Sequence, residues 1–234
     1  MTGRLYGIGL GPGDPELMTL KAVRLIAACP VIAYPAPDHG ESFARRIADG
    51  VIPDSAEEIP MIVPMRVERF PAQEVYAEAA AQIAAHLTAG RDVAVLCEGD
   101  PFFYGSFMYL FARLADDFAV EIVPGVSSLG ACAAAAARPL VARNDVLTIL
   151  PGPLSDAQLQ PRIEADESVA IMKVGRHLPR LRALLAKMGL TEKAVYIERA
   201  SLPEGRALPL SEAPEQAPYF SMILIYRGDD PWLK

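Results

Sequence analysis

The sequence predicts an α/β protein of two domains, the first built on a mainly parallel sheet and the second on a mixed sheet. Strand-like and helix-like segments alternate along most of the chain, glycine-rich turns follow several strands, and no helix follows the last strand. Strands that alternate with helices pair in parallel through right-handed crossovers. With 234 residues, 52% of them hydrophobic, the chain is long enough to build two small hydrophobic cores.

In the first half, apolar runs and helical spacing of apolar residues set the expected elements. The expected strands are Leu5–Leu10, Val31–Tyr34, Asp92–Leu96 and Val120–Val123. The expected helices lie around Met18–Ile26, Ser42–Ala48, Val75–Leu87, Ser106–Ala115 and Ser127–Ala137, with Gly90 as a C-cap. Residues 51–71 contain four prolines, which predicts an extended or irregular stretch.

The last third of the chain changes character. Strands are expected at Val146–Leu150, Val169–Val174, Val195–Ile197 and Phe220–Tyr226. Helices are expected near Leu159 and Leu181, together with a proline-rich stretch. We place the domain boundary between residues 115 and 123, which gives domains of residues 1–117 and 118–234.

Charge and cysteine usage argue against several classes of protein. The formal net charge is −7, whereas a general nucleic-acid binder needs a basic surface. The 3 cysteines (Cys29, Cys97, Cys132) are far apart, which favours reduced thiols in a cytoplasmic protein, and the 3 dispersed histidines indicate no metal site. No signal peptide is visible, and the longest uncharged stretch, residues 124–137, is too short for a membrane span of ~20 residues.

Three segments that follow predicted strands have the features of a ligand site. Residues 7–15 read GIGLGPGDP, residues 98–105 read EGDPFFYG and residues 123–128 read VPGVSS. Glycines let the backbone approach a ligand, and ligands of open α/β sheets bind beyond the carboxyl ends of strands. The first segment lacks the G-x-G-x-x-G spacing of dinucleotide-binding folds. Taken singly, each segment is also consistent with a tight turn, and the two serines with helix capping.

Together, these segments resemble the tetrapyrrole (porphyrin and corrin) methylase family in order and spacing. The matching motifs are G-x-G-P-G-D with a leucine-rich helix at residues 9–25, G-D-P at 99–101, P-G-x-S/T at 124–127, Met-Lys at 172–173 and Glu-Arg at 198–199. The resemblance covers essentially the whole chain. Any one motif is weak, but five in register are specific.

The resemblance implies two α/β domains with S-adenosylmethionine in the cleft between them, and a homodimer. By motif position, the cofactor contacts would come from Pro12, Glu98, Gly99, Asp100, Phe103, Ser127, Ser128, Met172, Ala200 and Ser201. Backbone groups are expected to make many of these contacts. Asp100 is the side chain expected most strongly to bind the cofactor.

Within the family, further features resemble the branch that methylates precorrin-2 at C20, to give precorrin-3A in cobalamin biosynthesis. They are Tyr34-Pro35, Glu41-Ser42, Pro64-Met65, residues 102–110 and residues 172–175. Uroporphyrinogen III methyltransferases usually carry an aspartate assigned to proton transfer where this chain has Pro35, which counts against that substrate.

The substrate that this branch implies carries eight carboxylates, so cations are expected in the site, arginine in preference to lysine. The candidate substrate residues are Tyr34, Arg45, Arg66, Tyr104 and Lys173. The sequence identifies no acceptor for the proton of the methylated carbon. It leaves open a cobalt-containing substrate, another corrin or uroporphyrinogen III methylation, and a non-catalytic nucleotide- or tetrapyrrole-binding module.

Overall fold

The computed structural model describes residues 1–63 and 70–228, with the backbone alone at 70–72. It divides the chain into two compact units, unit 1 (Met1–Ser127) and unit 2 (Ser128–Lys234). The boundary expected after residue 117 falls before the strand Val120–Val123, which pairs with the strand Leu5–Gly9 and so belongs to unit 1.

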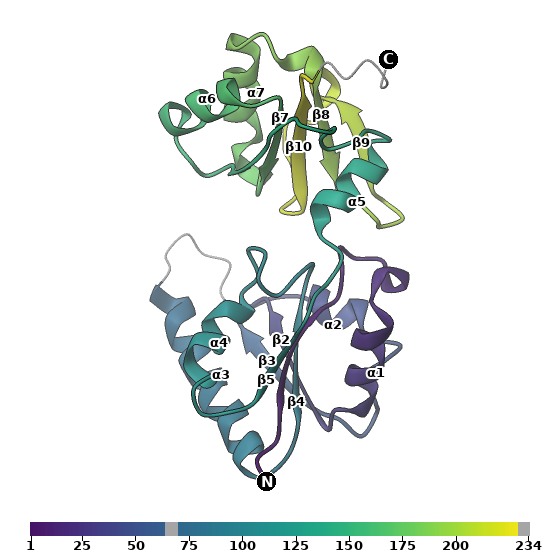
Figure 1. Ribbon diagram of the computed structural model, residues 1–234, viewed down its shortest axis with the longest axis vertical. Helices are drawn as coiled ribbons and strands as arrows, with labels where there is room; N and C mark the ends of the chain where they lie inside the picture. The colour runs from purple at the N-terminus through teal and green to yellow at the C-terminus, as the bar shows by residue number, and fades with distance from the viewer. Residues whose placement is uncertain (64–69, 229–234) are drawn as a thin grey trace. The chain divides into compact units, whose positions relative to one another are not determined.

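Unit 1 is built on a five-stranded sheet in the order β3-β2-β4-β1-β5, with parallel pairing throughout the described strands (Figure 1). Its strands are β1 (Leu5–Gly9), β2 (Val31–Ala36), β3 (Glu57–Ile62), β4 (Val93–Cys97) and β5 (Val120–Val123). The central strand β4 is buried along its whole length, which explains its uniformly apolar sequence. The prediction of a mainly parallel first sheet is confirmed.

Helices cover both faces of this sheet (Figure 1). They are α1 (Leu20–Ala28), α2 (Phe43–Ile47), α3 (Phe70–Thr88) and α4 (Phe107–Leu114), with a short 3-10 helix η1 (Pro15–Leu17) before α1. Buried residues of α3 and α4 pack on one face, and those of α1 and α2 on the other. The prediction that the chain is extended or irregular through Pro71 is wrong at its end, because α3 begins at Phe70. Proline fits the first turn of a helix, where its missing N–H would have no partner.

Unit 2 contains a mixed five-stranded sheet in the order β6-β7-β10-β8-β9, as predicted. Its strands are β6 (Leu147–Pro151), β7 (Ser168–Met172), β8 (Ala194–Glu198), β9 (Arg206–Pro209) and β10 (Ser221–Tyr226). Only β6 and β7 pair in parallel among the described strands. The sequence does not predict β9, a short edge strand that ends on Pro209. Proline is tolerated there because β9 lies at the edge of the sheet.

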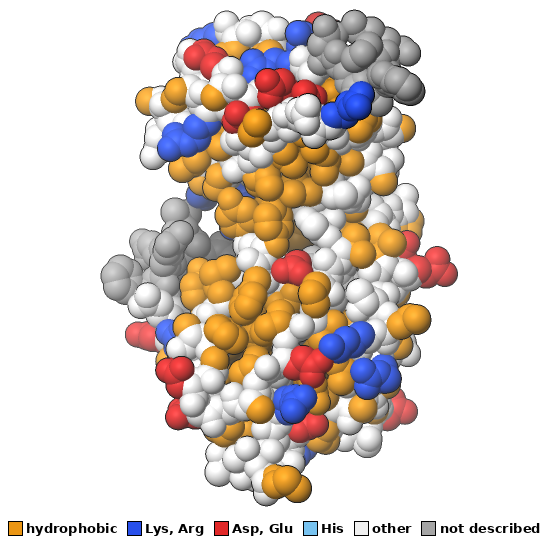
Figure 2. All heavy atoms as spheres, viewed as in Figure 1, with side chains coloured by type: hydrophobic (Ala, Val, Ile, Leu, Met, Phe, Trp, Pro, Cys, Tyr) orange, Lys and Arg blue, Asp and Glu red, His pale blue; other side chains and the backbone are white. Residues whose placement is uncertain are grey.

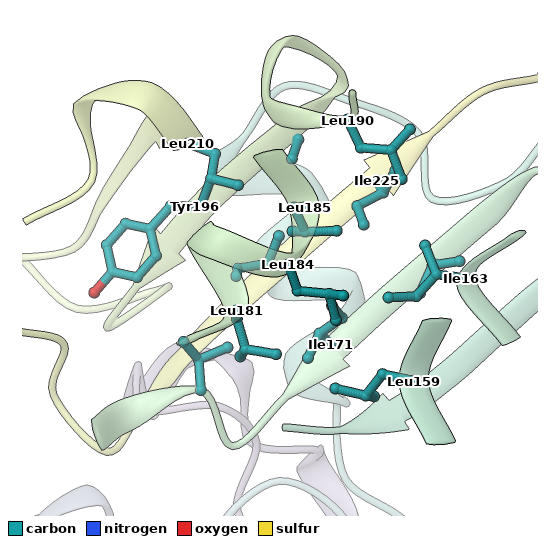
Figure 3. Packing of buried hydrophobic residues seen from close by; sticks show 14 of the residues in the cluster. Leu159, Ile163, Ile171, Leu181, Leu184, Leu185, Leu190, Tyr196, Leu210 and Ile225 are labelled. Carbon is teal, nitrogen blue, oxygen red and sulfur yellow. The ribbon is translucent and has the colours of Figure 1, made fainter. Parts of the chain in front are cut away.

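The core of unit 2 lies between its sheet and two helices, α6 (Asp156–Ala165) and α7 (Leu178–Lys187). Figure 3 shows Leu159 of α6 and Leu181 of α7 directed toward Ile171 of β7, all three fully buried. The helices predicted near Leu159 and Leu181 are therefore confirmed. The remaining helices are α5 (Ser128–Ala135) and the 3-10 turns η2 (Gly175–His177), η3 (Thr191–Lys193) and η4 (Leu210–Glu212). Over the described residues, no helix has both the length and the apolar character that a bilayer crossing requires.

Candidate functional site

Three loops meet at the carboxyl ends of β1, β4 and β5 in unit 1. The Gly11 amide donates a hydrogen bond to the Gly99 carbonyl at 3.2 Å, and the Gly99 amide donates to the Gly11 carbonyl at 2.7 Å. A Cβ added at Gly9 would lie 2.5 Å from the amide nitrogen of Gly125, so this close approach of two backbones requires glycine. The structure therefore brings the three glycine-containing segments of the sequence together.

The backbone at Gly99 borders open space, in contrast to Gly9 and Gly125. Gly99 has φ +65°, and a Cβ added there would meet no atom within 4 Å. Beside it, Pro12 is half-buried between Gly11 (φ +81°) and Gly13 (φ +147°). A ligand can therefore approach the main chain at Gly99 closely from the side where a Cβ would stand, while the amide and carbonyl of Gly99 are bonded to Gly11.

Asp100 holds two of the loops in place with its carboxylate. One oxygen accepts a hydrogen bond from the Phe102 amide at 2.9 Å, and the other accepts from the Gly125 amide at 3.1 Å. Both oxygens thus have backbone partners, one of them on a different loop. The structure gives Asp100 a role in positioning these loops, beside the cofactor contact that the sequence predicts for it.

Aromatic side chains follow Asp100 and remain accessible. Phe102 and Tyr104 are 47% and 44% exposed, and Phe103 is half-buried with its ring centroid 5.2 Å from that of Tyr104. Tyr104 has φ +56°, a strained conformation that tends to occur at functional sites. The exposed aromatics continue into α4 with Tyr109, and Figure 2 shows hydrophobic side chains gathered on the surface around this helix.

Glu98 stands at the start of the same loop, directly after β4. Its residue surface is partly exposed, but burial raises the pKa of its carboxyl. The backbone amides of Glu98 and of Ala44 in α2 act in the opposite direction, since they stabilise the ionised form. The carboxyl therefore lies between the end of the central strand and the beginning of α2.

The two serines lie where the sequence places them, at the beginning of α5. Ser127 is the last residue of unit 1, Ser128 is the first residue of α5, and both are half-buried.

A second group of candidate residues gathers at one edge of the sheet in unit 2. Since β6 is parallel to β7, and β10 runs antiparallel to both β7 and β8, the carboxyl ends of β6, β7 and β8 share an edge. The residues there include Met172 at the end of β7, Lys173 directly after it, and Ala200 and Ser201 after β8. Lys173, Arg199 and Ser201 all have positive φ, at 56°, 50° and 71°. Backbone strain is thus concentrated where two of the family motifs lie.

A buried carboxylate supports the strand that leads to this edge. Glu198 is 6% exposed; it accepts hydrogen bonds from the Tyr196 hydroxyl at 2.5 Å and from Arg206 Nε at 2.7 Å. The bond from Arg206 joins β8 to β9 just before the turn at Ala200. Sequence reasoning singled out Glu198 only as part of a motif, although its two-residue spacing from Tyr196 in a strand signals a shared face.

Two of the candidate substrate residues are engaged within unit 1. Arg45 donates two hydrogen bonds of 3.1 Å to Glu58, from Nε and from a terminal nitrogen, and also pairs with Asp49. Tyr34 is buried, and burial together with a hydrogen bond to Glu58 raises its pKa to about 12. Two carboxylates already surround Arg45, which makes it a poor receptor for a further carboxylate. Arg66 lies outside the described residues.

No group of three metal-ligating side chains occurs within residues 1–63 and 70–228. Cys29, Cys97 and Cys132 are all buried as free thiols.

Comparison with known proteins identifies the family. The sequence model of the tetrapyrrole (corrin/porphyrin) methylases matches residues 4–213. The chain belongs to this family. The match includes the loops after β1, β4 and β5 and the motifs after β7 and β8.

Individual relatives match over nearly the whole length of this chain and of their own chains. A precorrin-2 C(20)-methyltransferase from a Sinorhizobium species is 42% identical over 95% of each chain. A cobalt-precorrin-2 C(20)-methyltransferase from Salmonella typhimurium is 31% identical over 96% of this chain and 97% of that protein. Among solved structures, the uroporphyrin-III C-methyltransferase of Thermus thermophilus complexed with S-adenosylhomocysteine is 27% identical, with a TM-score of 0.70 over 95% of this chain and 92% of that one.

Proposed function

We propose that this methylase transfers a methyl group from S-adenosylmethionine to C20 of precorrin-2, which gives precorrin-3A in cobalamin biosynthesis. The observation that carries the proposal is the 42% identity to the Sinorhizobium precorrin-2 C(20)-methyltransferase through 95% of both chains. The Salmonella relative named for the cobalt-containing substrate is 31% identical. The metal-free tetrapyrrole is therefore the first candidate substrate.

The loops of unit 1 fit a nucleoside cofactor. Open space borders the backbone at Gly99, and the half-buried Phe103 offers an apolar surface beside it. Pro12, Glu98, Gly99, Asp100 and Phe103 are the proposed contacts in these loops, with the Asp100 carboxylate keeping the backbone in position through Gly125. That Ser127, Ser128, Met172, Ala200 and Ser201 contact the same cofactor molecule stays a prediction from the family resemblance.

The work left to the protein is alignment and the handling of a proton. When bound, S-adenosylmethionine supplies a methyl group that is already electrophilic. The chain must hold C20 of the macrocycle at near-attack distance, an effect that can lower a barrier by roughly 7–11 kcal/mol. Phe102 and Tyr104 offer exposed aromatic surface for the flat macrocycle.

Cations that bind the carboxylates of the substrate must lie outside the Arg45 network. Arg46, the next residue of α2, is exposed and its guanidinium lies 5.1 Å from the Phe43 ring centroid. Lys173 and Arg176, after β7, are exposed as well. We propose these three residues for carboxylate binding, with arginine suited to bidentate contacts.

The proposal includes a homodimer that works in the cytoplasm. The family resemblance supports the dimer, and three buried free thiols suit a reducing compartment. Light scattering on the purified protein should give twice the chain mass of 25.2 kDa. A monomer at micromolar concentration would contradict this part of the proposal.

A substrate comparison tests the function. The protein is incubated anaerobically with S-adenosylmethionine and, in separate reactions, metal-free precorrin-2, its cobalt complex and uroporphyrinogen III. We expect one methyl group to be added to precorrin-2, with slower turnover of the cobalt complex and little of uroporphyrinogen III. Preferred turnover of the cobalt complex would move the chain to that branch. Binding of the cofactor with no methylation of any of the three would favour a non-catalytic binding module.

A further inference from the structure

Glu98 is a half-buried residue directly after the central strand of unit 1. In the described part of the chain, no lysine or arginine forms an ion pair with it. The groups that stabilise its charged form are the backbone amides of Glu98 and Ala44. A buried carboxyl without a cation destabilises the fold when it ionises, so a glutamate at this position indicates a functional role.

The structure places Glu98 next to the end of β2. Strands β2 and β4 are parallel neighbours in register at Ala33 and Val95, so their carboxyl ends lie at the same edge. At that edge β2 presents Pro35, whose carbonyl accepts a hydrogen bond from the Ser42 hydroxyl at 2.5 Å. Because the side chain of proline cannot exchange a proton, any proton transfer here requires a group from a neighbouring element.

The other carboxylates near this edge already have defined partners. Asp100 bonds to the amides of two loops, and Asp14 accepts from the Glu16 amide at 2.9 Å at the start of η1. Asp38 and Glu41, in the loop after β2, are exposed. Glu98 differs from them because burial raises the pKa of its carboxyl while no described lysine or arginine forms an ion pair with it.

Two titratable groups of the described residues interact with Glu98 and do not compete with it for a proton. They are Cys97, its neighbour in β4, and Tyr76 of α3. Burial raises the pKa of both groups, so thiol and phenol stay neutral around pH 7. On α2, the nearest arginine in sequence to Ala44 is Arg45, which is held by Glu58 and Asp49.

We propose that the carboxylate of Glu98 accepts the proton that leaves C20 after methyl transfer, an inference that rests on the proposed function. In the transfer step the bond between C20 and the methyl carbon forms while the methyl–sulfur bond breaks, and its electron pair stays on sulfur. C20 then carries both the methyl group and its original hydrogen. The Glu98 carboxylate removes that hydrogen as a proton, the electron pair of the C–H bond returns to the conjugated macrocycle, and Glu98 releases the proton to water. No oxidant or reductant is needed.

An exchange experiment without cofactor tests the base directly. In D2O, protonated Glu98 would deliver a deuteron to the electron-rich C20, and its carboxylate would remove the original proton. We expect the purified protein to accelerate deuterium incorporation at C20 of precorrin-2, read by NMR. Glu98→Gln should lower this acceleration by at least ~10-fold. General bases typically contribute a rate acceleration of about 10²–10⁴-fold, so this is a low threshold. The matched control is Glu78→Gln, which changes an exposed glutamate of α3 and should exchange like the parent.

Binding and methylation measurements separate the inference from the proposed function. Glu98→Gln should remain folded by circular dichroism and lose kcat by at least ~10-fold. It should bind S-adenosylhomocysteine within ~2-fold of the parent, because the cofactor contact proposed for residue 98 is a backbone contact that the substitution keeps. Glu98→Asp should recover part of the exchange. If Glu98→Gln exchanges and methylates like Glu78→Gln, or loses cofactor affinity while exchange is normal, the inference is wrong and the proposed function stands. If the parent adds no methyl group to C20, the proposed function itself fails.

Discussion

The carboxylate of Asp100 accepts a hydrogen bond from the backbone amide of Gly125, 3.1 Å away and 25 residues later in the chain. This bond joins the loop after β4 to the loop after β5. It acts together with the backbone pairing of Gly11 and Gly99 to fix three loops at one edge of the first sheet. The geometry expected to receive the cofactor is therefore set mainly by contacts between loops.

Replacing Asp100 with Ala should weaken S-adenosylhomocysteine binding by about 1–3 kcal/mol, because two backbone amides lose their acceptor and the loops lose their connection. Calorimetry measures the affinity. Asp100→Asn keeps one carbonyl oxygen as an acceptor and should lie between the parent and Asp100→Ala. Parent-like affinity for Asp100→Ala would show that the loops hold their geometry without this carboxylate.

A pair of glycine substitutions tests the close approach of the loops. A Cβ at Gly125 would lie 2.0 Å from the Gly99 carbonyl oxygen, so Gly125→Ala should destabilise the fold by roughly 1–3 kcal/mol, as overpacking does. Gly130 lies in α5 with no atom within 4 Å of an added Cβ, and Gly130→Ala should instead stabilise by about 0.5–1 kcal/mol. Urea denaturation compares the two variants, and equal midpoints would contradict the described contact.

Two glutamate substitutions should respond to pH in opposite directions. The hydrogen bond from Arg45 lowers the pKa of Glu58, so its ion pair stabilises the fold at pH 7 and is lost as the pH falls through that lowered pKa. Glu58→Gln should therefore destabilise by ~0.3–1 kcal/mol at pH 7, typical of a partly exposed pair, and converge with the parent in acid.

Burial raises the pKa of Glu98, so the parent loses stability as the pH rises above the ordinary carboxyl range, and Glu98→Gln should become increasingly stabilising. Melting temperatures from pH 4 to 8 test both trends, and parallel curves would contradict them.

The parts of this account that follow from local pattern could be predicted from the sequence. Uniformly apolar β4 reads as a central strand, and Ser42 caps α2 by accepting a hydrogen bond from the Arg45 amide at 3.2 Å. The strand β9 and the first turn of α3 were harder to predict from the sequence, because both contain proline, which normally interrupts strands and helices.

The partners of individual side chains could not be predicted in the same way, because they depend on contacts across long sequence separations. Nothing in the local sequence shows that Asp100 bonds to Gly125, or that Arg45 of α2 is held by Glu58, 13 residues later in β3. The glycine motifs indicated where the loops lie. The tertiary contacts decide which side chains remain available to a ligand.

The position of the new carbon–carbon bond tests the central claim most directly. The protein is incubated with metal-free precorrin-2 and S-adenosylmethionine labelled with ¹³C in its methyl group, and the product is examined by NMR. The account predicts one labelled methyl group bonded to C20, and it predicts that C20 no longer carries a hydrogen. A label at any other ring carbon, or transfer only to uroporphyrinogen III, would contradict it.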